Sequence, residues 1–341
     1  MGTDAFLRQQ ETWFVSLGIL GALYVAVVAY RLFHISGLAL CLRQPKDLRR
    51  RYGAWAVVTG PTSGIGRSMA LELAQRGLNL VLVGRDPAML QDISETVSRT
   101  HGVLAKTVQF DFSLVSTPRG DGAMGRLREA VAGLDVGVLV NNAGVAKPGV
   151  VYLHEVDAEA WVSMIRVNLW AMTEVTAAVL PGMVDRGRGA VVNIGSGCTV
   201  ALPSVPFYSI YAATKRYVAQ FSRSLYVEYR GKGIDVQCQV PLFVDTKMMA
   251  KMMTWGGLMS QLITPTPDSY AHAAARWIGD GLPVCIPNLG HRLQMCFYQL
   301  LPDSIRVGAC VHEALHQRAL NLISSSPRRA PSHSVKGGLP P

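Results

Sequence analysis

Short apolar runs alternate with longer amphipathic segments along the chain from residue 54 onward. The short runs are rich in valine, isoleucine and leucine and carry few charges, which is typical of strands buried on both faces of a sheet. The longer segments repeat their apolar positions with a period near 3.6 residues, which predicts helices that cover such a sheet. The pattern predicts strands at residues 54–60, 79–84, 104–110, 136–142, 190–195 and 234–240.

The alternation of strand and helix also predicts the fold class. Consecutive strands joined by helical crossovers must run parallel, so we expect an α/β fold with a doubly wound parallel sheet of the Rossmann type. After residue 250 the pattern is less regular, with a helix at 269–281 and a short strand at 283–287. Residues 291–323 have helical periodicity and enough apolar positions to touch a membrane or to cover the sheet edge. The main crossover helices are predicted at residues 65–76, 87–99, 124–133, 158–184 and 211–230.

A different apolar pattern stands near the N-terminus, where residues 12–30 contain no charged side chain. At about 1.5 Å per residue this run is long enough to cross the ~30 Å core of a bilayer. Basic residues follow the run and only Arg8 precedes it, which disfavours a signal peptide and predicts that the chain downstream faces the cytosol. A buried core helix is the remaining alternative. We expect a short lumenal N-terminus (1–11), a transmembrane anchor (12–30), a basic juxtamembrane linker (31–53), a folded domain (54–323) and a disordered tail rich in serine, proline and glycine (324–341).

Composition agrees with contact to a membrane. The chain has 341 residues, of which 49% are hydrophobic and 16% charged, and its formal net charge is +10. The basic residues cluster after the apolar run without interleaved aromatic residues, which favours anionic lipid headgroups over nucleic acid; a solvated linker is the alternative. The six cysteines form no C-x-x-C pair and have no histidine at metal-site spacing, so we expect reduced thiols and no metal site.

A glycine-rich stretch, "VVTGPTSGIGR", joins the first predicted strand to the first predicted helix. Gly60, Gly64 and Gly66 follow a G-x-x-x-G-x-G spacing. Glycine permits a sharp turn and lets the backbone approach a pyrophosphate at the helix N-terminus. Thr62 and Ser63 can add hydroxyl donors. The stretch therefore predicts a dinucleotide site, with an ordinary glycine-rich turn as the alternative.

The end of the second predicted strand indicates which dinucleotide binds. A carboxylate there would bond the ribose hydroxyls and select NAD, but this chain has Gly84 followed by Arg85. An arginine beside a position without a side chain suits a 2′-phosphate, and Arg67 can assist it. Asp86 fits the N-cap of the next helix, with Pro87 at its first position. We therefore predict NADPH as the cofactor.

Other polar residues stand at the ends of predicted strands, where ligands bind in sheets of this type. Asp111 follows the third strand and can accept a hydrogen bond from the adenine amino group. Asn142 ends the fourth strand, and Asn168 lies in the middle of a predicted helix. Each residue alone is more often a turn residue or a satisfied amide.

Tyr211 and Lys215 lie four residues apart at the start of a predicted helix, in the stretch "YAATK", so they share one helix face. A tyrosine has an ordinary pKa near 10, which makes it a slow acid at neutral pH. An ammonium about 5 Å away would lower that pKa by about two units at an effective dielectric near 20. The pair is therefore predicted to move a proton.

In this order along the chain, the motifs resemble the short-chain dehydrogenase/reductase family over about residues 54–250. The resemblance implies that Tyr211 donates a proton to the forming alkoxide, that Lys215 binds the nicotinamide ribose and tunes Tyr211, that a serine polarises the carbonyl, and that Asn168 holds a water. Counting back thirteen residues from Tyr211 gives Cys198, whereas counting from the strand end gives Ser196. A strand end fixes a side chain better than a loop count, so Ser196 is predicted to act.

Two further residues, Tyr208 and Thr246, belong to the predicted site. Tyr208 has no lysine four residues later and is predicted to line the substrate pocket together with Ser196. Thr246 falls where a hydroxyl can meet the nicotinamide amide, although Leu242 replaces the glycine that the family often has there. The full set predicted to bind the cofactor is Gly60, Thr62, Ser63, Gly64, Ile65, Gly66, Arg85, Asp111, Asn142, Tyr211, Lys215, Val244 and Thr246.

Longer stretches, such as "IYAATKRYVAQFSRSLYVEYRGKGIDVQCQVPLFVDTKM", are similar to the plant very-long-chain 3-oxoacyl-CoA reductases. That resemblance implies NADPH-dependent reduction of a long-chain 3-oxoacyl-CoA at the endoplasmic reticulum membrane, with the catalytic domain facing the cytosol. It also implies elongase partners, namely a condensing enzyme, a dehydratase and an enoyl reductase. A 17β-hydroxysteroid dehydrogenase with the same site, and a non-catalytic elongase subunit, are the alternatives.

Overall fold

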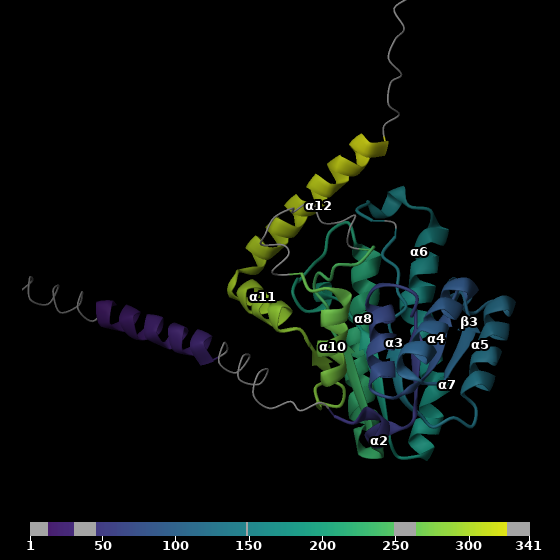
Figure 1. Cartoon of the computed structure of the whole chain (residues 1–341). Helices are drawn as coiled ribbons and strands as arrows, with labels where there is room; N and C mark the ends of the chain where they lie inside the picture. Colours follow the sequence, from purple (N-terminus) through teal and green to yellow (C-terminus); the bar gives the residue numbers. More distant parts are fainter. Residues whose placement is uncertain (1–12, 31–45, 148, 249–263, 326–341) are drawn as a thin grey trace, which may run out of the picture.

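The predicted doubly wound sheet is confirmed. The computed structural model of the chain describes residues 13–30, 46–147, 149–248 and 264–325. In these residues one sheet of seven parallel strands has the order β3-β2-β1-β4-β5-β6-β7 (Figure 1). The predicted strands fall within a residue or two of the observed ones: β1 (Trp55–Thr59), β2 (Asn79–Gly84), β3 (Ala105–Gln109), β4 (Val136–Asn141), β5 (Gly189–Ile194), β6 (Ile234–Gln239) and β7 (Val284–Cys285).

Helices cover both faces of the sheet, because successive strand residues point to opposite faces. Ala56 and Val58 of β1 pack in one core cluster with α3, α4 and α10, whereas Val57 packs in another with α5, α7 and α8. All of these side chains are buried, so the sheet has an apolar layer on each side. The covering helices are α3 (Gly64–Gln75), α4 (Pro87–His101), α5 (Pro118–Val131), α6 (Ala158–Ile165), α7 (Met172–Asp185), α8 (Ser209–Tyr229) and α10 (Pro267–Arg276).

Part of the segment expected to be a basic linker is a short helix, α2 (Leu48–Tyr52), that belongs to the folded domain. Leu48 and Tyr52 are buried in the core cluster of α3, α4 and α10. The Tyr52 hydroxyl donates to the Asp235 carboxylate at 2.5 Å, and Arg51 forms an ion pair with the same carboxylate at 3.2 Å. The compact part of the chain therefore begins ahead of residue 54, and the charge run is partly a helix surface.

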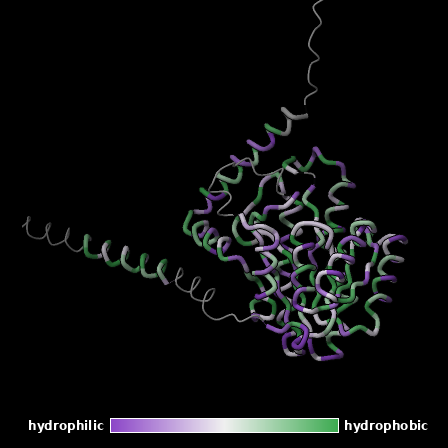
Figure 2. The backbone as a smooth tube through the Cα atoms, viewed as in Figure 1, coloured by the Kyte–Doolittle hydropathy of each residue, from purple (hydrophilic) through white to green (hydrophobic). Residues whose placement is uncertain are grey.

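The apolar N-terminal run is helical from Trp13 to Tyr30. Its 18 residues have a mean hydropathy of 2.0 (Figure 2), and none of that span is buried. The stretch Ala158–Asp185 is also long and apolar, but half of it is buried against the sheet. Length and composition make the N-terminal helix a candidate membrane span, whereas the second stretch is a core element of the domain.

The predicted helical stretch 291–323 is two helices, α11 (Leu289–Leu300) and α12 (Asp303–Ser325). The break falls at Pro302, which lacks the N–H that a continuous helix needs. The Arg318 guanidinium on α12 bonds both oxygens of Glu155, at 2.6 and 2.5 Å. This contact links α12 to the short helical turn η2 (Leu153–Glu155). The predicted tail lies outside the described residues from 326 onward, and residues 324 and 325 end α12.

Candidate active site

Tyr211 and Ser196 meet at the carboxyl edge of the sheet. Ser196 lies two residues after the end of β5, and Tyr211 lies in the first turn of α8. Burial raises the pKa of Tyr211, while a hydrogen bond with the Ser196 side chain acts in the opposite direction. Ser196 also shares a hydrogen bond with Cys198, whose pKa is raised by burial. Ser196, the serine predicted from the strand end, therefore bonds the Tyr211 phenol, and the Cys198 thiol bonds the same serine.

Lys215 is buried beneath this pair and points to the backbone of β5. Its Nζ donates to the Ile194 carbonyl at 2.9 Å, and burial lowers its pKa. The expected lowering of the Tyr211 pKa by Lys215 is therefore wrong for this structure. Burial of the phenol outweighs its favourable contacts, and the ammonium is turned to a carbonyl.

Asn168 lies in a π-helical turn, η3 (Arg166–Ala171), between α6 and α7. Its amide oxygen accepts from the Val145 N–H at 2.8 Å, and its Nδ2 donates to the Val145 carbonyl at 2.8 Å and to Thr214 Oγ1 at 3.2 Å. A Cβ on Gly144 would stand 3.4 Å from both Asn168 Oδ1 and Lys215 Nζ. A side chain at this position after β4 would therefore contact both polar atoms.

The glycine turn between β1 and α3 has the features of an anion site. Gly60 and Gly64 have φ of +64° and +53°, the left-handed region that favours glycine. A Cβ on Gly66 would lie 2.1 Å from the Gly60 carbonyl oxygen, so only glycine fits there. Ser63 is the N-cap of α3 but makes no side-chain cap bond, which leaves the first helical N–H groups for a ligand. The residues present fit a dinucleotide pyrophosphate.

Asn142 supports this turn rather than standing over it. Its Nδ2 donates to the carbonyls of Thr59 and Gly60, each at 3.1 Å. Thr59 Oγ1 in turn accepts from the N–H groups of Asn142 and Ala143, each at 3.0 Å. Sequence reasoning missed Thr59, whose only signal was a hydroxyl at the end of an apolar strand. Together these residues lock the ends of β1 and β4 to each other.

The remaining predicted cofactor residues surround the same edge. Ile65 packs on the core, and the methyl group of Thr246 would lie 3.2 Å from a Cβ on Gly64, which places the loop after β6 at the glycine turn. Val244, two residues earlier, is buried in that loop. Asp111 accepts from the Ser113 N–H at 3.0 Å and from the Ser113 hydroxyl at 2.8 Å. The carboxylate is thus used in part for local structure.

The side chains at the end of β2 suit a phosphate better than a ribose diol. Arg85 is exposed directly after the buried Gly84. Asp86 caps α4 by accepting from the N–H groups of Ala88 and Met89, as its position before proline predicts. Arg67 stands 3.7 Å from Asp92. The one carboxylate next to Arg85 in sequence is therefore used as a helix cap.

A cleft with mainly apolar walls opens beside Tyr211. Tyr208 is in its wall, and the two tyrosine rings stand edge to face with centroids 6.4 Å apart. Burial raises the pKa of Tyr208 to about 12. Phe207, which has a positive φ of +64°, was not singled out by its sequence. The cleft is lined by Gly149, Val151, Leu153, Val156, Trp161, Met164, Phe207, Tyr208, Ser209, Ile210 and Tyr211.

Behind these residues a line of buried polar side chains joins four elements. Asn141 Nδ2 on β4 donates to Thr176 Oγ1 on α7 at 2.9 Å and to Asn193 Oδ1 on β5 at 2.8 Å. Asn193 Nδ2 donates to Ser222 Oγ on α8 at 2.9 Å. All four side chains are buried. The helices that carry Asn168 and Tyr211 are therefore connected through the sheet by hydrogen bonds.

Comparison with known proteins gives consistent matches over most of the chain. A family model described as short chain dehydrogenase matches residues 54–256. A very-long-chain 3-oxoacyl-CoA reductase-like protein of Arabidopsis thaliana is 46% identical over 265 residues, covering 77% of this chain and 82% of the relative. The 17-beta-hydroxysteroid dehydrogenase type 3 of Rattus norvegicus is 35% identical over 296 residues, covering 86% and 92%. The solved structure of a short-chain dehydrogenase from Sphingobium yanoikuyae in complex with NADPH has a TM-score of 0.60 and 28% identity, covering 82% of this chain and 98% of that one.

Proposed function

The chain belongs to the short-chain dehydrogenase/reductase family, and from this premise we propose that it reduces a very-long-chain 3-oxoacyl-CoA to the 3-hydroxyacyl-CoA with NADPH. The observation that carries the proposal is the hydrogen bond between Tyr211 and Ser196, at the base of an apolar cleft. The Arabidopsis relative supports the 3-oxoacyl-CoA class, and the NADPH complex of the solved relative supports the cofactor.

The chain's own residues account for the proton side of the reaction. NADPH, when bound, supplies the hydride to the carbonyl carbon. The Ser196 hydroxyl donates a hydrogen bond to the carbonyl oxygen, and Tyr211 transfers its phenolic proton to that oxygen as the alcohol forms. Because burial raises the pKa of Tyr211, the phenol carries its proton at neutral pH, as a proton donor must.

Lys215 and Asn168 have roles behind the tyrosine. The Lys215 ammonium is held in place by the Ile194 carbonyl, and we propose that it binds the nicotinamide ribose. The amide of Asn168 fixes the segment after β4 through two hydrogen bonds to Val145. We propose that a water between these groups returns the proton to Tyr211.

The cofactor is proposed to lie along the carboxyl edge of the sheet. The glycine turn and the first N–H groups of α3 would hold its pyrophosphate, and Arg85 its 2′-phosphate. Thr246 beside Gly64 would meet the nicotinamide end. The remaining predicted positions, Thr62, Ser63, Ile65, Asp111, Asn142 and Val244, would shape the same groove.

We propose that the helix Trp13–Tyr30 anchors the enzyme in the endoplasmic reticulum membrane, with the domain on the cytosolic side. The support is the uncharged helix and the basic residues that follow it. A lipid substrate and elongase partners, namely condensing enzyme, dehydratase and enoyl reductase, fit a reductase held at that surface. We keep the division into anchor, linker and reductase domain that the sequence predicts, and we extend the reductase domain to include α2.

The test is NADPH oxidation by the detergent-solubilised full chain with a very-long-chain 3-oxoacyl-CoA. Tyr211→Phe should remove turnover while NADPH still binds, and Tyr208→Phe, in the same cleft, should retain it. Turnover that survives Tyr211→Phe contradicts the assignment of the acid. A steroid 17-ketone is the second substrate to assay, because the Rattus relative is a 17-beta-hydroxysteroid dehydrogenase. Turnover of the steroid alone would select that alternative, and no turnover of either would favour a non-catalytic subunit.

A further inference from the structure

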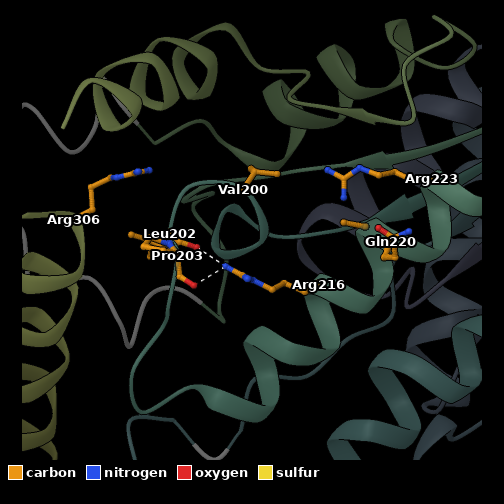
Figure 3. Close-up of a pocket in the computed structure, with 8 residues that line it drawn as sticks. Val200, Leu202, Pro203, Arg216, Gln220, Arg223 and Arg306 are labelled. Carbon is orange, nitrogen blue, oxygen red and sulfur yellow. Dashed lines mark hydrogen bonds between the residues drawn. The ribbon is translucent and has the colours of Figure 1, made fainter. Parts of the chain in front are cut away.

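A cavity of about 470 Å³ lies beside α8, away from the apolar cleft at Tyr211. Its volume is within the range of about 300–1,000 Å³ that small-molecule sites have. Three of its side chains are arginines, and none of the lining residues is acidic. Figure 3 shows that Arg223 and Arg306 extend toward each other from opposite sides, with Val200 between them. The lining consists of Val200, Leu202, Pro203, Arg216, Ala219, Gln220, Arg223 and Arg306.

Two of the arginines also hold the loop that forms one wall. Arg216 Nη2 donates to the carbonyls of Leu202 and Pro203, at 2.7 and 2.8 Å (Figure 3). Arg306 Nη1, from α12, donates to the Ala201 carbonyl at 2.9 Å, and its other terminal nitrogen forms an ion pair with Asp303. Arg306 Nε is buried and has no hydrogen-bond partner. These guanidinium groups are fixed in place with donor capacity left over.

Arg223 differs from the other two arginines. Across the ranges that the structure describes, it makes no hydrogen bond or ion pair, and its side chain is exposed toward the cavity. One carboxylate, that of Asp303, accompanies the three guanidinium groups. An arginine fork matches the oxygens of a phosphate through paired charge-assisted hydrogen bonds. The excess positive charge therefore suits a ligand that carries phosphate.

The position of the cavity relates it to the catalytic site. Its wall, Val200 to Pro203, is the continuation of the loop that begins at Ser196. At about 1.5 Å per residue, Arg216 and Arg223 lie about 8 and 18 Å further along α8 than Tyr211. A substrate whose reacting carbonyl sits at Tyr211 and whose charged end is at the cavity would have to be long, with phosphates far from the reacting atoms.

We propose that this arginine cavity binds phosphate groups and, on the basis of the proposed function, receives the phosphates of the CoA part of the substrate. The acyl chain would then occupy the apolar cleft by Tyr211 and Tyr208, and the thioester arm would run along the Ser196 loop. Arg223 is the residue that meets the ligand without a structural role of its own.

Binding of free coenzyme A to the detergent-solubilised full chain tests the cavity directly. The titration is done by calorimetry with saturating NADP⁺, so that coenzyme A cannot enter the dinucleotide site. Arg223→Gln should weaken binding about tenfold, because a charge-assisted contact is lost. Arg99→Gln, an exposed arginine on α4, is the matched control and should bind as the wild type does. Equal affinity of the wild type and Arg223→Gln would overturn the proposal.

Two other probes distinguish the source of the phosphate. Inorganic phosphate should bind much more weakly than coenzyme A. Vesicles that contain phosphatidic acid should show no Arg223-dependent binding beyond that of neutral vesicles. If either probe depends on Arg223 while coenzyme A does not bind, the cavity takes phosphate from another source and the CoA assignment is wrong.

Kinetics separates this inference from the proposed function. Arg223→Gln should raise KM for the 3-oxoacyl-CoA about tenfold with kcat unchanged, and should leave KM for the matching 3-oxoacyl-pantetheine thioester, which lacks the nucleotide phosphates, unaltered. Equal KM changes for both thioesters would overturn the proposal. Absence of turnover with any 3-oxoacyl substrate would count against the reductase, whereas the calorimetric result would still decide the cavity.

Discussion

Replacing Gly66 by alanine gives a sharp test of the glycine turn. The added Cβ would stand 2.1 Å from the Gly60 carbonyl oxygen and 2.2 Å from Asn142 Nδ2, far inside contact distance. Neither neighbour can yield easily, since the first is backbone and the second donates to Thr59 and Gly60 at 3.1 Å. The turn must therefore open by roughly 1.4 Å, as the usual contact between non-bonded heavy atoms is about 3.5 Å.

The energetic cost follows from these contacts. Overpacking a close-packed site costs about 1–3 kcal/mol, and each lost hydrogen bond of Asn142 adds about 1 kcal/mol. Alanine gains at most about 1 kcal/mol over glycine within a helix. We expect the free energy of unfolding to fall by about 2–4 kcal/mol. NADPH affinity should fall at least tenfold, because the first N–H groups of α3 no longer point at one phosphate position.

The assay is NADPH binding by fluorescence titration, together with chemical unfolding of the detergent-solubilised chain. Gly125→Ala is the matched control, because Gly125 lies inside α5 and a Cβ there would meet nothing within 4 Å. That variant should bind NADPH normally and be slightly more stable. If Gly66→Ala binds NADPH as tightly as the wild type, the argument that the turn is built for close backbone approach fails.

Two predictions concern the ends of the domain. Leu48→Ala should lower the free energy of unfolding by about 2–5 kcal/mol, although Leu48 lies in a basic segment, because it is buried in the core; an unchanged unfolding curve would show that α2 is not part of the domain. The Arg318 hydrogen bond lowers the pKa of Glu155 to about 2, so the contribution of this pair to stability is present above the ordinary pKa of 4.5 and is lost as pH falls through about 2. Hydrogen exchange of α12 should accordingly rise over that range, and Glu155→Gln should remove the pH dependence; the same dependence in the variant would refute the assignment.

The strands could be predicted because their signal is local. Runs of β-branched residues without charges have few alternatives to burial in a sheet, so the boundaries of β1, β2 and β5 were nearly right. Helix α5 begins at Pro118, six residues before the predicted start. Its first turns contain Gly120 and Gly122, which interrupt the apolar periodicity, while the cap by Thr117 fixes the start.

What could not be predicted depends on tertiary contacts. Leu48 and Tyr52 flank three arginines, so the sequence predicts that residues 48–52 belong to a basic linker. Both side chains are nevertheless buried in the core. The direction of the Lys215 ammonium was equally invisible, because spacing along a helix says nothing about a carbonyl on a neighbouring strand. The approach of Thr246 to Gly64, which are far apart in the sequence, depends on the order of the strands in the sheet.

The buried hydrogen bonds from Thr176 through Asn141 and Asn193 to Ser222 limit how far the helices at the site can move relative to each other. Apolar surfaces can slide over one another by a fraction of an ångström at little cost, because contact area hardly changes. A hydrogen bond, in contrast, is directional and keeps its donor and acceptor within about 2.7–3.2 Å. The hydrogen bonds therefore fix the position of α7 relative to α8. The distance between Asn168, in the turn η3 that continues into α7, and Tyr211 on α8 is fixed with it.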